Sequence, residues 1–143
     1  MATEYVVGFL FSDDRKKVAL IRKQRPEWQR GKLNGIGGHI DEYESRDQAM
    51  VREFKEETGR YITAKWTPYC TIKNADFVVY FFKAFSTVDL ALLDSPTDEE
   101  IVIYEVDALP DNVIPNLRWL IPMALDNELR FSITTYWELP GDG

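Results

Sequence analysis

Three glutamates near the middle of the chain restrict its fold and chemistry more than any other feature. If the segment is helical, Glu53, Glu56 and Glu57 project from one face within an arc of roughly 100°. Carboxylates placed so closely repel one another, which disfavours the bare helix unless a cation lies among them. The spacing therefore predicts a helix that carries a divalent-metal site for phosphate chemistry.

The available ligand types indicate which metal this site would hold. Cys70 is the only cysteine and His39 the only histidine, so one chain cannot assemble a zinc site of the Cys/His kind. Hard cations prefer carboxylate and carbonyl oxygens, and Mg²⁺ keeps several waters while it bridges carboxylates to substrate phosphates. We therefore expect Mg²⁺, with Mn²⁺ as a substitute.

Local signals define the ends of this helix. Ser45 and Gln48 have the spacing of a capping box, which opens a helix near Arg46. Gly59 stands where a left-handed C-terminal cap belongs, so the helix should span about thirteen residues. Before the helix, the glycines at 35, 37 and 38 predict a loop without side-chain bulk. Such a loop lets backbone groups approach a metal or phosphates closely.

The rest of the chain has the patterns of strands and one further helix. Its single domain, over residues 1–143, is predicted to be an α/β fold with a mixed sheet between two helices. The second helix is predicted at Asn116–Leu125, and Pro26–Lys32 and Ser86–Thr97 are predicted connections. The predicted strands are Tyr5–Phe11, Val18–Lys23, Tyr61–Trp66, Thr67–Lys73, Phe77–Phe85, Ile101–Val106 and Phe131–Trp137.

Charge is distributed unevenly along the chain. The net charge of -7 argues against general binding to duplex nucleic acid, which needs a basic surface. Residues 15 to 32 nevertheless hold eight cations and one acid, a local charge of +7. Because this segment leads into the glycines and the acidic helix, Arg22 and Lys23 are candidates for contacts with substrate phosphates. The alternative for both is an ordinary solvated strand end.

The location of the protein is inferred from what the sequence lacks. It contains no apolar stretch of about 18 residues, so we expect no membrane span. Residues Met1 to Glu4 lead directly into an alternating segment rather than a secretory signal. We therefore expect a cytoplasmic protein, and a single cysteine agrees with a reducing compartment.

The run from residue 38 to residue 59 has a fixed spacing of acids, glycines and an arginine: Gly38, Glu44, Arg52, Glu53, Phe54, Glu56, Glu57 and Gly59. It resembles the Nudix box, the signature of MutT-type hydrolases that cleave nucleoside diphosphates linked to another group. The departure is Arg60, where the family usually has an aliphatic residue. This resemblance implies the α/β/α Nudix sandwich over nearly the whole chain.

The resemblance also implies where a metal would bind. In the family, the acids at the positions of Glu53, Glu56 and Glu57 hold one or more Mg²⁺ ions. A backbone carbonyl of Gly37 or Gly38 would complete this ligand set.

Further catalytic roles follow from the same resemblance. Arg52 would orient a carboxylate of the cluster through a charge-assisted pair, with Glu44 as its candidate partner. Glu53 or Glu56 would accept the proton of the attacking water. Some branches use instead an acid in the loop before a later strand, where Asp98, Glu99 and Glu100 stand and Glu99 is the foremost candidate.

Substrate recognition is suggested by a narrower resemblance. Residues 31–38 resemble the W-N-G-F-G-G-K segment of the oxidised-purine nucleoside triphosphatase branch, in which the counterpart of Asn34 helps to read the base. Asn116 stands where that branch has an acid against the purine edge, so it would offer an amide instead. A (d)NTP is therefore the favoured substrate, with nucleotide-pool sanitising as the role and no implied preference for 8-oxo-purines.

Other readings of the family resemblance stay open. The protein would then be an ADP-ribose or dinucleoside polyphosphate hydrolase, or a nucleotide-sensing Nudix module without catalysis. Several Nudix enzymes dimerise, so a homodimer is open as well.

Overall fold

The strand Thr3–Ser12 (β1) organises the sheet. In the computed structural model, which describes residues 2–62 and 65–138, β1 pairs in parallel with β6 (Phe77–Ser86) along its whole length. The other edge of β1 is divided between two strands. β4 (Ile36–His39) pairs antiparallel with its first half, and β2 (Lys17–Arg22) pairs antiparallel with its end. The glycines of β4 are thereby hydrogen-bonded to β1, the central strand of the sheet.

Further strands extend the sheet on both sides of this centre. β5 (Thr67–Lys73) pairs with β6, and β8 (Ile133–Tyr136) pairs in parallel with β5. On the other side, β2 pairs with β3 (Leu33–Asn34) and with β7 (Ile101–Glu105). The described residues thus form one eight-stranded sheet that contains parallel and antiparallel pairs.

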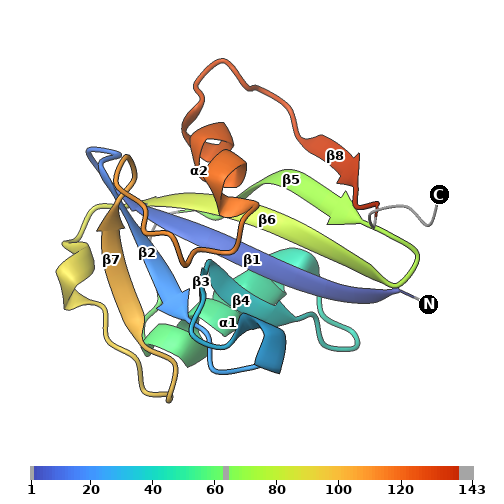
Figure 1. Cartoon of the computed structure of the whole chain (residues 1–143), viewed down its shortest axis with the longest axis horizontal. Coiled ribbons are helices and arrows are strands. Elements are labelled where there is room, and N and C mark those ends of the chain that lie inside the picture. Colours follow the sequence, from blue (N-terminus) through green and yellow to red (C-terminus); the bar gives the residue numbers. More distant parts are fainter. Residues whose placement is uncertain (1, 63–64, 139–143) are drawn as a thin grey trace.

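Two helices cover opposite faces of this sheet (Figure 1). Because side chains alternate along a strand, Val6 and Leu10 of β1 pack on the side of α1 (Arg46–Thr58). Phe9 and Phe11 pack on the side of α2 (Leu117–Leu125). The predicted α/β architecture, a mixed sheet between two helices, is confirmed.

Each helix contributes its apolar stripe to one hydrophobic cluster. Met50 and Phe54 of α1 are fully buried beneath the sheet, where Trp66 packs against Phe54 at a ring distance of 5.4 Å. On the other face, Leu120 of α2 is fully buried, and its carbonyl accepts a hydrogen bond from the Tyr69 hydroxyl (2.9 Å). Two short 3₁₀ turns, Glu27–Gln29 and Leu90–Leu92, lie in the connections.

Two local predictions differ from the structure. The predicted glycine loop is in part a strand, since Gly37 and Gly38 lie in β4 and pair with Val7 and Val6. The strand predicted over 61–66 is absent at residues 61–62 and 65–66, which are irregular, while residues 63–64 lie outside the described residues. Within the described residues, no helix is long and apolar enough to cross a membrane.

Candidate active site

α1 begins and ends where its local sequence predicts. The Ser45 hydroxyl accepts the N–H of Gln48 at 3.1 Å, and the Gln48 side chain accepts the N–H of Ser45 at 2.9 Å. Gly59 ends the helix with a φ of 73°, in the left-handed region. Between these caps the helix packs Ala49, Met50 and Phe54 on the sheet, which places Glu53 against Gly38 of β4.

Arg52 binds three glutamates at once. Its Nε and Nη2 donate in parallel to Glu44 Oε2 (2.7 Å) and Oε1 (2.9 Å). Its Nη1 donates to Glu53 Oε1 at 3.0 Å and to Glu56 Oε2 at 3.2 Å. Nη2 also donates to the backbone carbonyl of His39 at 2.8 Å. Arg52 therefore joins the loop after β4 to α1, and its hydrogen bonds hold the pKa of Glu44 below its usual value.

Glu53 is a buried carboxylate pressed against a glycine. It is 8% exposed, and burial raises its pKa, although Arg52 lowers it in part. A Cβ atom at Gly38 would stand 2.6 Å from Glu53 Oε1, so only glycine leaves space there. A Cβ atom at Gly37 would collide with the backbone carbonyl of Val6 on β1. Gly37 is thus required by the backbone of β1, whereas a side chain at position 38 would have to displace the Glu53 carboxylate.

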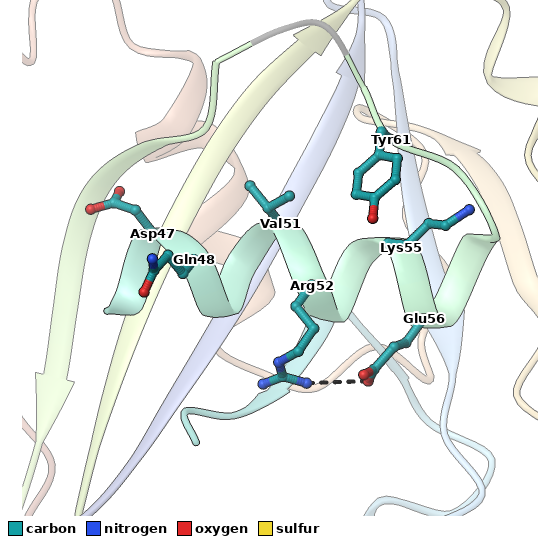
Figure 2. A pocket seen from close by; sticks show the side chains of 7 residues that line it. All are labelled: Asp47, Gln48, Val51, Arg52, Lys55, Glu56 and Tyr61. Atoms are coloured by element: carbon teal, nitrogen blue, oxygen red, sulfur yellow. Dashed lines mark hydrogen bonds and ion pairs between the residues drawn. The ribbon is translucent and has the colours of Figure 1, made fainter. Parts of the chain in front are cut away.

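Glu56 lies on the more open side of the helix. Its side chain is 57% exposed and its one ion pair among the described residues is with Arg52. Figure 2 shows this pair at one rim of a hollow on the outer face of α1, with Val51 and Tyr61 at the opposite rim. The hollow has a volume of about 610 Å³ and is lined by Asp47, Gln48, Val51, Arg52, Lys55, Glu56 and Tyr61.

Glu57 faces the loop that precedes β7. Burial raises the pKa of Glu57, the neighbouring Glu99 and Glu53 raise it further, and Lys23 lowers it. The Thr97 hydroxyl lies 3.4 Å from Glu57 Oε2 as a hydrogen-bond donor. The structure thus brings Glu99, which is 42 positions from Glu57 in sequence, next to the acidic face of α1.

The predicted phosphate-binding cations lie close to three consecutive acids. Lys23 Nζ is 3.3 Å from Glu99 Oε1, and the Arg22 guanidinium is 3.6 Å from Glu100. These pairs continue the pairing of β2 with β7, because the N–H of Arg22 bonds to the carbonyl of Glu100 (2.8 Å). In the same way, the guanidinium of Arg25 binds both carboxylate oxygens of Asp98, at 3.1 and 2.6 Å. The charge of the basic segment is therefore partly compensated within the protein.

The two predicted base-reading amides lie on neighbouring segments. Asn34 ends β3, and its Nδ2 donates to Gln29 Oε1 at 3.2 Å. Leu33 of the same strand bridges to Val113, which brings the segment before α2 alongside β3. Asn116 directly precedes α2, and its Oδ1 is buried without a hydrogen-bond partner in the described part of the chain. A buried acceptor left unpaired is costly, so this oxygen is a local strain on the fold of the segment before α2.

Comparison with known proteins shows which family the chain belongs to. The sequence profile of the NUDIX domain matches residues 2–141, nearly the entire chain. The chain belongs to the Nudix domain family. Its members that hydrolyse act on nucleoside diphosphate derivatives and generally need divalent metal ions, typically Mg²⁺. No curated protein sequence matches the chain.

Solved Nudix structures share the fold at low sequence identity. A NUDIX-family hydrolase from Clostridium perfringens is 21% identical, with a TM-score of 0.70 over 88% of this chain and 97% of that one. A MutT NUDIX hydrolase from Burkholderia pseudomallei is 18% identical, with a TM-score of 0.69 over 86% of this chain and 98% of that one. The NUDIX domain of Shewanella oneidensis NrtR, solved with ADP ribose, is 20% identical, with a TM-score of 0.68 over 87% of each chain.

The acidic face of α1 fits a hard divalent cation in its donor chemistry. Its side chains offer carboxylate oxygens only, and Glu57 has a raised pKa partly because Glu53 and Glu99 carry the same charge nearby. A cation would relieve that repulsion and favour the ionised carboxylates. Within residues 2–62 and 65–138, no three acidic, histidine or cysteine side chains converge on one point. Glu56 is turned toward Arg52 instead, so it would have to leave this partner to join the ligand set.

Some residues at this Nudix site carry no signal in the sequence spacing. Thr97 touches Glu57 from 40 positions away, and the backbone carbonyl of His39 binds Arg52 irrespective of its side chain. Tyr43 is 96% exposed and has a φ of 67° immediately before Glu44, a conformation that favours glycine. The one sequence signal for this pairing is that residues 22–25 carry three positive charges and residues 98–100 carry three negative charges.

Proposed function

We propose that this Nudix protein is a Mg²⁺-dependent pyrophosphohydrolase that cleaves a (d)NTP to (d)NMP and pyrophosphate. The observation that carries the proposal is that the three Nudix acids Glu53, Glu56 and Glu57 lie on one capped helix, where Arg52 binds the first two of them. A domain that had lost catalysis would have no need of the buried, mutually repelling carboxylates that the helix retains.

Each residue of the set has a proposed task. Glu53, Glu56 and Glu57, with a carbonyl of Gly37 or Gly38, would hold the metal, which when bound neutralises phosphate oxygens and orients the attacking water. Arg52 keeps the Glu53 carboxylate in one orientation, because its Nη1 donates to Oε1 at 3.0 Å.

Proton transfer is assigned to Glu53 rather than Glu56. Burial raises the pKa of Glu53, and a base works best when its pKa approaches the working pH. Glu56 has a mostly exposed side chain, so nothing in its surroundings excludes bulk water from a proton transfer. Glu56 would therefore serve as a metal ligand only.

The nucleotide would lie across the sheet from the metal side toward α2. Lys23 and Arg22 would contact its phosphates, and Asn34 and Asn116 its base. The Asn116 side chain would have to turn toward the ligand, where its Oδ1 could accept from the exocyclic amino group or ring N–H of a base. Glu99 would act at the phosphate end, next to Lys23.

ADP-ribose is the second candidate substrate. The NUDIX domain of NrtR binds ADP ribose and shares the fold over 87% of both chains. ADP-ribose contains the same nucleoside diphosphate unit as a (d)NTP, so the same metal and Arg52 arrangement would serve both. The two substrates differ in the group beyond the second phosphate.

Product analysis tests the proposal. Purified protein is incubated with canonical and oxidised (d)NTPs, ADP-ribose, dinucleoside polyphosphates and CoA, in the presence of Mg²⁺ or Mn²⁺, and products are separated by chromatography. Formation of (d)NMP and pyrophosphate from one (d)NTP, lost in Glu57→Gln, is the expected result. Preferred cleavage of ADP-ribose would favour the second candidate. No turnover of any compound, with a ligand still raising the melting temperature, would refute catalysis and indicate a sensing module.

A further inference from the structure

Glu99 is a buried carboxylate that lies outside the catalytic helix. It is 3% exposed, more deeply buried than Glu53. An ionised carboxylate is stable in such a place only when cations and hydrogen-bond donors surround it. The identity of its partners therefore indicates what this side chain does.

The two oxygens of Glu99 have different partners. Oε2 accepts the backbone N–H groups of Gln24 (2.6 Å) and Arg25 (3.3 Å), the residues that follow β2. Oε1 accepts a hydrogen bond from Lys23 Nζ at 3.3 Å. One oxygen thus holds the main chain of the loop, and the other holds the ammonium group at its start.

The same arrangement reaches the catalytic helix. The Thr97 hydroxyl accepts the N–H of Glu99 at 3.1 Å and lies 3.4 Å from Glu57 Oε2. Thr97 therefore links the backbone of Glu99, whose side chain binds Lys23, to the Glu57 carboxylate of α1.

We propose that Glu99 is a positioning residue that holds Lys23 against the loop that contacts Glu57, with its ammonium group available to a substrate phosphate. An ammonium has three donors, and within the described residues only Glu99 accepts one of them. The remaining donors can bind a phosphate oxygen. Because a phosphate ligand is part of the function proposed above, this role for Lys23 rests on that function.

This role differs from that of a general base or a metal ligand. Both oxygens of Glu99 are already engaged by protein donors, so neither is directed at a water or a metal. To ligate a metal, Glu99 would have to release Lys23 or the loop.

Glu99→Gln separates the two tasks of the side chain. Its amide oxygen can still accept the N–H groups of Gln24 and Arg25, whereas its NH₂ group would face Lys23 donor to donor. Glu99→Ala removes both contacts. Glu27→Gln makes the same chemical change on an exposed side chain of the loop and is the matched control.

Steady-state kinetics on the nucleotide found to be cleaved give the first measurement. In Glu99→Gln, KM is expected to rise about tenfold with kcat nearly unchanged, as for the loss of one contact to a charged group. Lys23→Met is expected to raise KM similarly, and adding Glu99→Gln to it should have no further effect. A fall in kcat of about 100-fold or more at unchanged KM would assign Glu99 as a base and overturn the proposal. Additive effects of the two substitutions would also overturn it.

Two further measurements need no substrate. Binding of Mn²⁺ alone, followed by electron paramagnetic resonance, is expected to be the same in Glu99→Gln, Glu27→Gln and the unaltered protein. Amide exchange at residues 24 and 25 should be faster in Glu99→Ala and unchanged in Glu99→Gln. Weaker Mn²⁺ binding in Glu99→Gln, or unchanged exchange in Glu99→Ala, would refute the positioning role. If no nucleotide is cleaved, these two measurements still decide about Glu99, so its failure and that of the proposed function are distinguishable.

Discussion

Replacement of Arg52 by lysine tests whether the shape of the guanidinium, rather than its charge, holds the site together. Arg52 and Glu44 are joined by two parallel bonds of 2.7 and 2.9 Å, and their side chains are only 26% and 15% exposed. Lysine keeps the positive charge but offers a single ammonium, which cannot form the parallel pair and reach Glu53 at the same time.

The structure gives the size of the expected loss. Hydrogen bonds to charged groups contribute about 1.5–3 kcal/mol each, and lysine can recover one of the two bonds to Glu44. We therefore expect Arg52→Lys to lower the free energy of unfolding by about 2 kcal/mol at pH 7. In a chain of 143 residues this corresponds to a melting temperature lower by about 4–8 °C.

The loss should also depend on pH. Because Arg52 lowers the pKa of Glu44 in the folded protein, the stabilisation is present above the unfolded pKa of about 4.3 and is lost as the pH falls through the lower folded value. The difference between the two proteins should therefore shrink below pH 4.3.

Urea unfolding of metal-free protein at pH 7 and at pH 3.5 measures both effects. Glu44→Gln is the companion variant, and the double variant completes a cycle that isolates the pair. Two results would refute the conclusion that the Arg52 guanidinium holds the site together: a difference in free energy of unfolding between the two proteins of less than about 0.5 kcal/mol at pH 7, or a difference that does not shrink in acid.

Three further predictions concern single positions. Gly38→Ala places a methyl group against the Glu53 carboxylate, so turnover should fall by about 100-fold while the circular dichroism spectrum is retained; turnover near that of the unaltered protein would contradict the close packing. Tyr43→Gly removes a strained φ of 67° and should raise the free energy of urea unfolding by about 0.5–1 kcal/mol, whereas Tyr43→Ala should not; equal effects would rule strain out. Glu57→Gln should stabilise the metal-free protein at neutral pH. The pKa of Glu57 is raised in the folded protein, so ionisation of this carboxyl lowers the free energy of unfolding as the pH rises, and glutamine does not ionise. Thermal unfolding should show this gain at pH 7 and not near pH 4, and a destabilised variant at pH 7 would be inconsistent with the pKa shift.

The helix could be predicted from sequence because its signals are local. Ser45, Gln48 and Gly59 each act within one turn of the helix, so their meaning does not depend on the rest of the fold. The same holds for the alternation in β1, where each residue type matches its face. The α/β architecture followed from these local patterns.

The remaining features depend on pairing between distant residues. Gly37 and Gly38 form a strand because β1 supplies the partner backbone, and nothing adjacent to them in sequence shows that. The residues at 61–66 include types that are common in strands. Trp66 nevertheless packs against Phe54 in the hydrophobic cluster under α1. Likewise, the partners of Lys23 lie 76 positions away, so its counter-charge could not be deduced from its own neighbourhood.

The sheet separates the hydrophobic interior into two compartments, one under α1 and one under α2. The compartment under α1 adjoins Gly38, Arg52 and Glu53, whereas Asn116 precedes the helix on the other side. Changes in compartments that share few contacts combine additively, so variation can accumulate on the α2 side without disturbing the acids of α1. If the proposed roles hold, a lineage built on this plan could change the base it binds while the acidic helix stays the same.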